Sequence, residues 1–332
     1  MSVFVHYDGV FKNMALILHA PAKINLYLKV QNRRQDGYHN IHSLMQMVGL
    51  YDTLTFQEDG AHIRLEVAKA KIPNNNSNLI LRAARMLQKE MGKTDKISRG
   101  VTITLEKNIP VAAGLGGGSA DAAATLVGLN QLWSLGLSRS HLAKLGGYVG
   151  SDVPFFFYGP TAWVSGKGDR VKKETSTLHG FIVLVFSGDP VSTAEIFHQI
   201  GQEIDLTKRG NTLNMRKAKM RNVAAAPSVQ EVLYYPENDL EKVTLKAQPN
   251  LVKVKALLES FGGEGALMSG SGPTVFARFG NEDHANDAAS SMRGLGYKDV
   301  WVAKMLTRAP RGFGSTTPAR GGWGSPRFSD SI

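Results

Sequence analysis

Asp152 and Lys23 are the residues whose types and surroundings best suit proton chemistry. Asp152 stands between the glycine turn at residues 147–150 and the apolar run at residues 153–157, which places a carboxylate near apolar walls. Lys23 belongs to an alternating segment, residues 22–30, whose polar face also carries Asn25 and Tyr27. A carboxylate beside an anion site can act as a general base, whereas an aspartate in this setting is also a common turn or N-cap residue. The residues alone leave both roles of Asp152 open.

A glycine-rich segment at residues 109–125 has the composition of an anion site. Its four glycines, residues 114 and 116–118, can adopt positive φ and expose backbone N–H groups to a ligand. We expect a helix over residues 119–133 with Ser119 as its N-cap, so that its first-turn N–H groups face the same place. The segment is not a Walker loop, which requires Lys-Ser/Thr where Ser119 and Ala120 stand, and it lacks the third glycine of the dinucleotide fingerprint. It is either a phosphate cradle or a capped glycine turn.

Two further segments carry residue types found in binding sites. Tyr38 and His39 follow the polar turn at residues 33–37 and form a pair able to stack on a ring and hydrogen-bond to it. His39 and His42 are three residues apart, but no cysteine or carboxylate cluster joins them, so we do not expect a metal site there. A second glycine-rich element, residues 262–272, leads into an apolar strand that ends at Phe279.

The hydrophobic pattern predicts strands and helices on both sides of the first glycine segment. Strands are expected at residues 14–19, 22–30, 52–56, 63–67, 101–107, 161–165, 170–173, 181–186 and 300–304. Helices are expected at residues 79–91, 138–146, 252–261 and 282–292, and another begins at residues 192–197. The strand at 101–107 leads directly into the glycine segment, which is the order that a phosphate site requires. Residues 210–228 are polar and lack periodicity, which predicts an inserted loop.

Length and composition limit the class of protein. With 332 residues and 42% apolar content, the chain can form two domains. No run of about 18 apolar residues is present, and Asp8 and Lys12 interrupt any signal-peptide core. We therefore expect no membrane span and a cytoplasmic location. The lack of cysteine excludes disulfides and thiolate chemistry. We also expect residues 1–13 to be a dispensable N-terminal extension, or Met14 to be the natural start.

The net charge of +11, from 39 Lys and Arg against 28 Asp and Glu, indicates an anionic partner. Much of the excess lies at residues 208–221 and after residue 307, in polar segments. A nucleic-acid-binding protein is one alternative, but residues 208–221 contain no aromatic side chain to stack on a base. We therefore expect neither nucleic acid nor a membrane as partner, and we interpret residues 307–332 as a disordered basic tail.

Three segments stand in the order and approximate spacing of known kinase motifs. They are Pro21-Ala-Lys-Ile-Asn-Leu26, the run from Pro110 to Ser119, and Leu267-Met-Ser-Gly-Ser-Gly-Pro-Thr274. Over residues 14–305 the chain resembles the galactokinase, homoserine kinase, mevalonate kinase and phosphomevalonate kinase (GHMP) superfamily. The resemblance implies an α+β fold of two subdomains. The half at residues 14–178 would be ribosomal-protein-S5-like and bind ATP, and the C-terminal half at residues 179–306 would be ferredoxin-like.

Further matches narrow the resemblance within the superfamily. Asp36-Gly-Tyr-His39, residues 116–123 and Gly150-Ser-Asp-Val-Pro-Phe155, with the motif at 21–26, resemble kinases of the non-mevalonate isoprenoid pathway. This implies transfer of the γ-phosphoryl group of ATP, with Mg²⁺, to the 2-hydroxyl of a cytidine diphosphate-linked methylerythritol. Homoserine and mevalonate kinases are the alternative within the superfamily, although the pair Tyr38 and His39 suits a nucleobase. Such a small-molecule kinase would be a monomer or a homodimer.

The resemblance also implies roles for individual residues. Asp152 would accept the proton of the substrate hydroxyl, and Lys23 would keep Asp152 ionised and steady the attacking oxygen. The implied ATP-binding residues are Lys107, Pro110, Gly114, Leu115, Gly116, Gly117, Gly118, Ser119 and Ala120, with Ser119 also a Mg²⁺ ligand. The implied substrate-binding residues are Asn25, Tyr38, His39, Asn78, Thr193, Gly270, Ser271 and Gly272. Ala120 stands where many relatives have a second serine, so one hydroxyl contact to magnesium or phosphate is missing.

Overall fold

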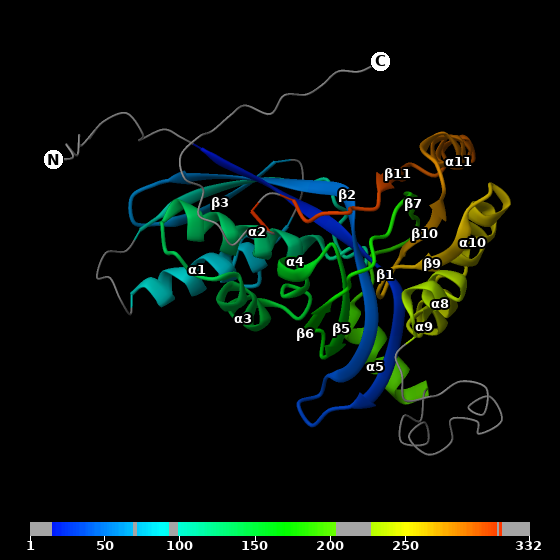
Figure 1. The fold of residues 1–332 in the computed structure, drawn as a ribbon, viewed down its shortest axis with the longest axis horizontal. Helices are drawn as coiled ribbons and strands as arrows, with labels where there is room; N and C mark the ends of the chain where they lie inside the picture. Colours follow the sequence, from blue (N-terminus) through cyan, green and yellow to red (C-terminus); the bar gives the residue numbers. More distant parts are fainter. Residues whose placement is uncertain (1–14, 69–71, 93–98, 204–226, 311, 314–332) are drawn as a thin grey trace.

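The computed structural model describes residues 15–68, 72–92, 99–203, 227–310 and 312–313. Within them the chain forms two β-sheets flanked by helices (Figure 1). The larger sheet has the strand order β3-β4-β2-β1-β8, with β5 paired to β2 and β6 to β5. Its strands are β1 (Leu16–Arg33), β2 (His39–Glu58), β3 (Ile63–Ala68), β4 (Val101–Glu106), β5 (Thr161–Gly166), β6 (Arg170–Lys173) and β8 (Glu237–Asn238). The smaller sheet contains β7 (Phe181–Phe186), β9 (Glu264–Met268), β10 (Thr274–Phe279) and β11 (Asp299–Lys304).

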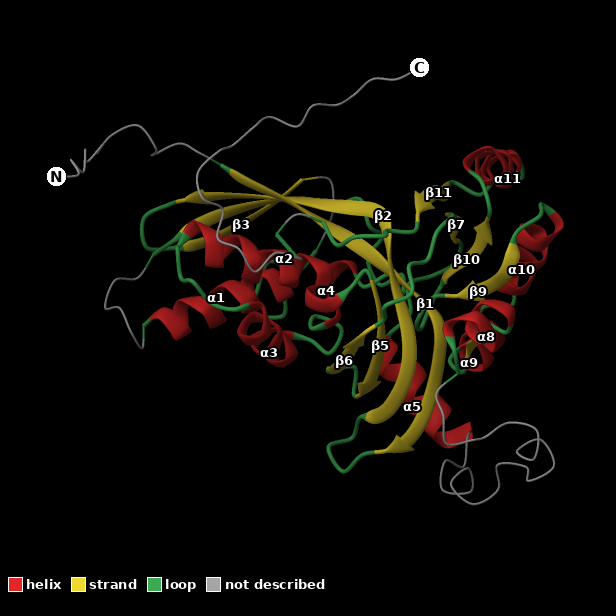
Figure 2. Ribbon diagram, viewed as in Figure 1, coloured by secondary structure: helices red, strands yellow, loops and turns green. Residues whose placement is uncertain are grey.

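Helices pack on both sheets in two sets (Figure 2). The first set lies against the larger sheet and comprises α1 (Leu79–Met91), α2 (Gly117–Leu132), α3 (Arg139–Val149) and the short α4 (Phe155–Tyr158). The second set comprises α5 (Thr193–Glu203), α8 (Val229–Tyr234), α9 (Glu241–Ala247), α10 (Asn250–Ser260) and α11 (Glu282–Gly294). This arrangement confirms the α+β class expected from the sequence.

The larger sheet is organised around one long hairpin, β1 and β2. The sequence predicts two strands in place of β1, at 14–19 and 22–30, and a strand at 52–56 only for the second half of β2. The structure corrects this, because both strands continue through the expected gaps. The pairing of β1 with β2 shifts register between Pro21 and Ala22. Proline cannot donate to the sheet ladder, and the irregularity accommodates it without ending the strand.

Helix α2 begins earlier than expected. It starts at Gly117, and its N-cap is Gly116, which has φ 68° in the left-handed region and makes no side-chain capping hydrogen bond. The predicted cap, Ser119, instead lies inside the first turn, so that prediction is wrong. Because the first-turn N–H groups receive no side-chain cap, they remain directed at a ligand.

The C-terminal half has the topology expected from the resemblance. Its strands and helices follow one another as β7, a helical region, β9, β10, α11 and β11, and its spatial strand order is β11-β7-β10-β9. All neighbouring strands in this sheet are antiparallel. This is the ferredoxin-like arrangement. Strand β8 leaves this half and pairs with β1 in parallel at Tyr27 and Leu28, so the two halves also share a sheet.

Buried apolar side chains in the described part of the chain form three clusters. The first fills the space between the larger sheet and α1 to α4, and the second fills the space between the smaller sheet and its helices. The third joins the two halves, because Ile24 and Leu26 of β1 pack there with Leu184 and Phe276 of the smaller sheet. Strand β1 is consequently buried without interruption from Ala20 to Leu26. This contact fixes the position of the cleft between the halves.

Some expectations fall on residues that the structure does not describe. They concern the extension at 1–13, the basic stretch at 208–221, nearly all of the expected loop at 210–228, and most of the tail after residue 307. The tail differs from the expectation at its start, because Phe313 is buried in the first cluster and Ala309 packs against it. No helix among the described residues has the length and hydropathy needed to cross a bilayer.

Candidate active site

Most of the residues singled out in the sequence meet at one cleft of about 480 Å³ between the two halves. That volume suits a small-molecule ligand. The expected site residues that line it are Lys23, Asn25, Asn78, Lys107, Pro110, Gly114, Gly116, Gly117, Gly118, Ser119, Asp152, Thr193, Gly270 and Ser271. They come from β1, the start of α1, the glycine loop, the turn before α4, the start of α5 and the loop between β9 and β10.

The glycine loop requires glycine because other groups approach its backbone closely. Gly114 has φ 76°, and a Cβ atom there would lie 2.0 Å from the carbonyl oxygen of Ser269. At Gly116 a Cβ atom would lie 2.8 Å from Cγ of Lys23. The loop is therefore packed between the lysine of β1 and the second glycine-rich loop. Lys23 and Ser269 therefore both lie against the backbone of the loop that would bind the anion.

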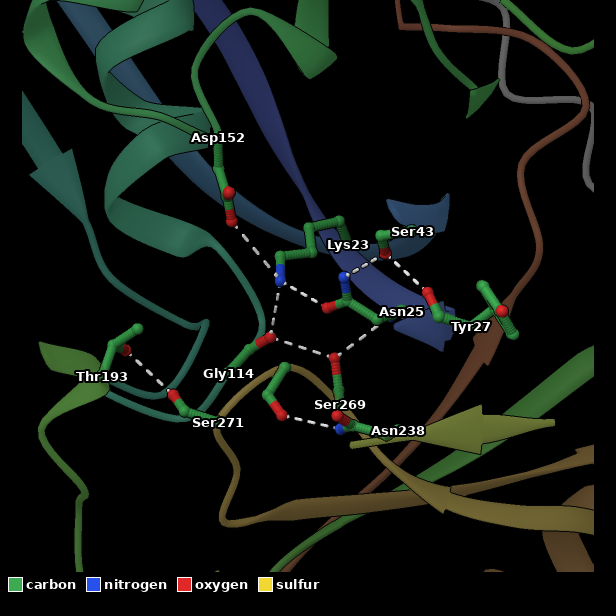
Figure 3. A network of polar contacts seen from close by, with 11 residues as sticks. Lys23, Asn25, Tyr27, Ser43, Gly114, Asp152, Thr193, Asn238, Ser269 and Ser271 are labelled. Carbon is green, nitrogen blue, oxygen red and sulfur yellow. Dashed lines mark hydrogen bonds and ion pairs between the residues drawn. The ribbon is translucent and has the colours of Figure 1, made fainter. Parts of the chain in front are cut away.

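Lys23 is held by three acceptors (Figure 3). Its Nζ donates to Oδ1 of Asn25 at 2.7 Å and to the carbonyl of Gly114 at 3.0 Å, and it lies 3.4 Å from Oδ2 of Asp152. An ammonium group has three N–H donors, so each donor has one acceptor. The Lys23 side chain is 5% exposed whereas that of Asp152 is 28% exposed. The lysine is consequently the fixed partner, and the carboxylate is the one that an incoming hydroxyl can reach.

The turn that carries Asp152 does not use it as a helix cap. The N-cap of α4 is Pro154, which lies two residues later, and the Asp152 carboxylate is instead directed toward Lys23 (Figure 3). Of the two roles that the sequence leaves open, the geometry therefore favours the carboxylate as a chemical group of the cleft.

Asn25 is oriented by a chain of hydrogen bonds with a defined direction (Figure 3). The hydroxyl of Ser43 donates to the carbonyl of Tyr27 at 2.6 Å, and Nδ2 of Asn25 donates to the Ser43 oxygen at 2.9 Å. A carbonyl only accepts, so the serine must donate to it and accept from the amide. This fixes the amide with Oδ1 toward Lys23. Ser43, which sequence reasoning missed, is fully buried.

The loop between β9 and β10 is tied to its surroundings at several points. The Ser269 hydroxyl donates to the carbonyl of Gly114 at 2.9 Å, so the two glycine loops are joined directly. Nδ2 of Asn238 donates to the carbonyl of Gly270 at 2.7 Å, and the hydroxyls of Thr193 and Ser271 are 2.9 Å apart. These contacts place Gly270 and Ser271 on the cleft.

Lys107 lies beneath the start of α2 between two buried carboxylates. Its Nζ contacts Oδ2 of Asp52 and lies 3.2 Å from Oδ2 of Asp121. Asp52 also accepts from the backbone N–H groups of Asn108 and Ile109, at 2.7 and 2.9 Å. Burial raises the pKa of Asp121 well above its usual range, against the opposing effect of Lys107. This arrangement anchors the beginning of the glycine loop.

Neither carboxylate was singled out from the sequence. Asp121 is an acidic residue inside a helix otherwise composed largely of alanine, glycine and leucine, and that contrast is the signal that would have identified it. Asp52 begins an ordinary strand-like segment and offers no comparable signal.

The opposite end of the cleft is aromatic. His39 is buried as the first residue of β2 and stacks on Phe197 of α5, with ring centroids 5.8 Å apart and planes at 23°. Phe197 lines the cleft, and sequence reasoning missed it. Burial and the positive charge of Arg33 lower the pKa of His39, which favours the neutral imidazole. Within the described residues its Nε2 atom is buried and has no hydrogen-bond partner.

Five expected site residues do not line the cleft. Leu115 and Ala120 are buried in the hydrophobic clusters, so their side chains are directed away from a nucleotide. Tyr38 and His39 were expected side by side in one loop, but Tyr38 is 57% exposed in the turn while His39 enters β2 and is buried. Gly272 lies behind the loop, where a Cβ atom would meet Met268 at 2.4 Å.

Two family descriptions match this chain, one in each half. The GHMP kinases N terminal domain matches residues 78–160, and the GHMP kinases C terminal description matches residues 225–298. The first match contains the glycine loop and Asp152, and the second contains the loop between β9 and β10. Both glycine-rich loops of the cleft therefore lie inside matched regions.

Curated relatives match over most of their own length. The 4-diphosphocytidyl-2-C-methyl-D-erythritol kinase of Syntrophus aciditrophicus is 44% identical over 284 residues, which cover 85% of this chain and 95% of the relative. The enzyme of the same name from Exiguobacterium sibiricum is 42% identical over 294 residues, covering 88% of this chain and 99% of the relative.

Solved structures agree with this likeness. The crystal structure of a 4-(cytidine 5'-diphospho)-2C-methyl-D-erythritol kinase superposes with a TM-score of 0.68 at 32% identity, over 87% of this chain and 99% of that one. A homoserine kinase from Cytophaga hutchinsonii superposes with a TM-score of 0.69 at 18% identity, over 93% of this chain and 99% of that one. At that identity the second likeness concerns the fold alone.

Proposed function

Because this chain belongs to the 4-diphosphocytidyl-2-C-methyl-D-erythritol kinases of the GHMP family, we propose that it transfers the γ-phosphoryl group of ATP to the 2-hydroxyl of 4-diphosphocytidyl-2-C-methyl-D-erythritol. The product would be the 2-phosphate, an intermediate of the non-mevalonate isoprenoid pathway. The observation that carries the proposal is the ion pair of Lys23 with Asp152 beside the glycine loop, 3.4 Å between Nζ and Oδ2.

The triphosphate of ATP would lie on the first-turn N–H groups of α2. These groups have no side-chain cap, and fixed backbone donors stabilise the charge that develops as the phosphoryl group moves. Lys107 lines the same wall, and its ion pairs with Asp52 and Asp121 hold the start of the glycine loop in place. Ile72, Pro73 and Leu79 line the cleft near Asn78 and offer apolar surface for the adenine ring.

Mg²⁺ would accompany ATP. Among the described residues no group of three or more histidines and carboxylates could hold a metal by itself. This fits Mg²⁺, which is commonly held by few protein ligands together with substrate phosphates and water. Ser119 lines the cleft in the first turn of α2, so its hydroxyl would supply the protein ligand. The metal would neutralise charge on the phosphates.

Asp152 would accept the proton of the substrate hydroxyl as that oxygen attacks phosphorus. A general base must lie within hydrogen-bond reach of the proton that it removes, and Asp152 is the more exposed member of its ion pair. Lys23 would hold the carboxylate in place through their ion pair. Asn25 and Gly114 would hold Lys23, because they supply its other two acceptors.

The aromatic end of the cleft would bind the cytosine. The ring of Phe197 offers a stacking surface. His39 stacks on Phe197 and would hold that ring in position. Tyr38 lies in the adjoining turn and would cover the ring from the solvent side. Thr193 and Ser271 would contact the part of the substrate between the base and the reacting hydroxyl.

The proposal is tested by ADP release with a panel of alcohols. We expect turnover with 4-diphosphocytidyl-2-C-methyl-D-erythritol and none with mevalonate or homoserine. Turnover of mevalonate or homoserine without the cytidyl substrate would overturn the assignment.

Two variants test the chemistry separately from the substrate. Asp152→Asn and Lys23→Ala should each lower kcat by a factor on the order of 10²–10⁴ with little change in ATP affinity. Asp287→Asn, an exposed carboxylate on α11, is the matched control and should leave kcat unchanged. A mild effect at Asp152 would mean that the carboxylate positions the substrate without acting as a base.

A further inference from the structure

The cleft has few charged side chains. Within the described residues, its lining contains the cations Lys23, Lys107 and Lys167 and the carboxylates Asp121 and Asp152. The first two lysines are committed, because Lys23 pairs with Asp152 and Lys107 lies between Asp52 and Asp121. A substrate that carries a diphosphate brings negative charge in addition to that of ATP. Among the described lining residues, Lys167 is the remaining cation.

Lys167 has no carboxylate partner at ion-pair distance in the described part of the chain. Its ammonium lies 5.5 Å from the centroid of the Tyr38 ring. Lys167 helps to lower the pKa of Asp36, although the hydrogen-bonded ion pair of Asp36 with Arg34 contributes more. That pair is formed at 2.9 Å on the exposed side of the turn. Lys167 is thus available to an anionic ligand.

The backbone holds Lys167 between the two ends of the substrate site. It lies at the tip of the β5–β6 hairpin, where Gly166 and Gly168 have φ values of 69° and 113° and Asp169 accepts from the Lys167 N–H at 3.2 Å. A Cβ atom at Gly168 would lie 3.2 Å from that of Ser151, so the hairpin tip rests on the turn that carries Asp152. The other neighbour of Lys167 is Tyr38, at the aromatic end. In a nucleotide-linked alcohol, the diphosphate lies between the base and the reacting hydroxyl.

We propose that Lys167 binds the diphosphate of the substrate and so selects a nucleoside diphosphate-linked alcohol over an uncharged nucleoside or a simple alcohol. The assignment rests on the proposed function, because it uses the same cleft and the same orientation of substrate. The ammonium acts as a charge-assisted donor to phosphate oxygens. Its position beside Tyr38 places that charge next to the nucleobase site.

The test compares two probes that differ only in the diphosphate, cytidine 5'-diphosphate and cytidine. Their affinities are measured by calorimetry with a non-hydrolysable ATP analogue present at saturation, so that neither probe occupies the ATP site. In Lys167→Met we expect cytidine diphosphate to bind about tenfold more weakly while cytidine binds as before. Lys172→Met, an exposed lysine on β6, is the matched control and should retain the preference. Lys167→Arg should retain it too, because the charge remains.

Steady-state kinetics provide the second readout. Lys167→Met should raise KM for the cytidyl substrate about tenfold, with KM for ATP unchanged. Equal weakening of both probes, or no change in either, overturns the assignment. These outcomes are separate from a failure of the proposed function, which would appear as no turnover of the cytidyl substrate by the unaltered protein.

Discussion

Gly116→Ala should displace the Lys23 side chain from at least one of its acceptors. Gly116 has φ 68°, and placing alanine in the left-handed region costs about 1–2 kcal/mol of folding free energy. The new Cβ atom would also lie 2.8 Å from Cγ and 3.0 Å from Cε of Lys23. Because the lysine ammonium is held by three acceptors, the side chain can yield only by leaving at least one of them.

Gly136→Ala separates the cost of the left-handed backbone from the contact of the new Cβ atom with Lys23. Gly136 has a similar φ of 66°, but nothing lies within 4 Å of a Cβ atom built there. Denaturant unfolding should therefore show a loss of about 1–2 kcal/mol in both variants, with a further loss of about 1–3 kcal/mol in Gly116→Ala from overpacking.

The kinetic outcomes should differ more strongly. In ADP-release kinetics, Gly136→Ala should keep the original kcat, whereas Gly116→Ala should lower it by about 10²-fold, the cost of displacing a catalytic group by about 1 Å. Equal kcat values in the two variants would refute the reasoning. So would a rise confined to KM for ATP, because the methyl group would then contact the nucleotide and not Lys23.

Variants at three further positions test other parts of the site. Ser43→Ala leaves the buried Asn25 amide without its acceptor. It should therefore lower the free energy of unfolding by about 1–3 kcal/mol and lower kcat. Ser43→Thr keeps the hydroxyl and should retain more of kcat. Because burial raises the pKa of Asp121, the folded state binds its proton more tightly than the unfolded state, and wild-type stability should fall as pH rises above about 4. Asp121→Asn cannot ionise, so urea unfolding should show its stability relative to wild type increasing with pH, and a constant difference would contradict this. Phe197→Ala removes the stacking surface at the aromatic end and should raise KM for the cytidyl substrate alone, and a change in KM for ATP would place the base elsewhere.

The local pattern of the sequence predicted most elements but not their continuity. The helices at 79–91 and 282–292 appear close to the expected bounds, because their caps, Asn78 and Asn281, accept hydrogen bonds from the first turn. The sequence predicts two strands in place of β1, because Pro21 usually ends a strand and only the long partner strand allows the ladder to continue past it. The residue type of Ser119 predicts a helix cap, whereas the left-handed Gly116 occupies that position.

The site residues also divide into those that a local motif identifies and those whose role depends on distant partners. Glycine motifs, Lys23 and Asp152 could be identified because their residue types suit one kind of chemistry. Ser43, Asp52 and Phe197 could not, because each is an ordinary strand or helix residue whose function depends on a partner distant in the sequence. The exposure of Tyr38 and the burial of His39 follow from the point at which β2 begins, and no local pattern marks that point.

The geometry of β1 explains why the reacting pair depends on both halves of the molecule. Lys23 and Asn25 lie between two shifts in the pairing of β1 with β2, at Pro21/Ala22 and Asn25/Tyr27. Such irregularities re-aim side chains in a sheet, so the polar face of β1 is directed at the glycine loop over this short stretch only. The Ser269 hydroxyl from the C-terminal half then donates to the same Gly114 carbonyl that accepts from Lys23. A displacement of either half would therefore move an acceptor of Lys23, and the apolar contact around Ile24 and Leu26 resists that displacement.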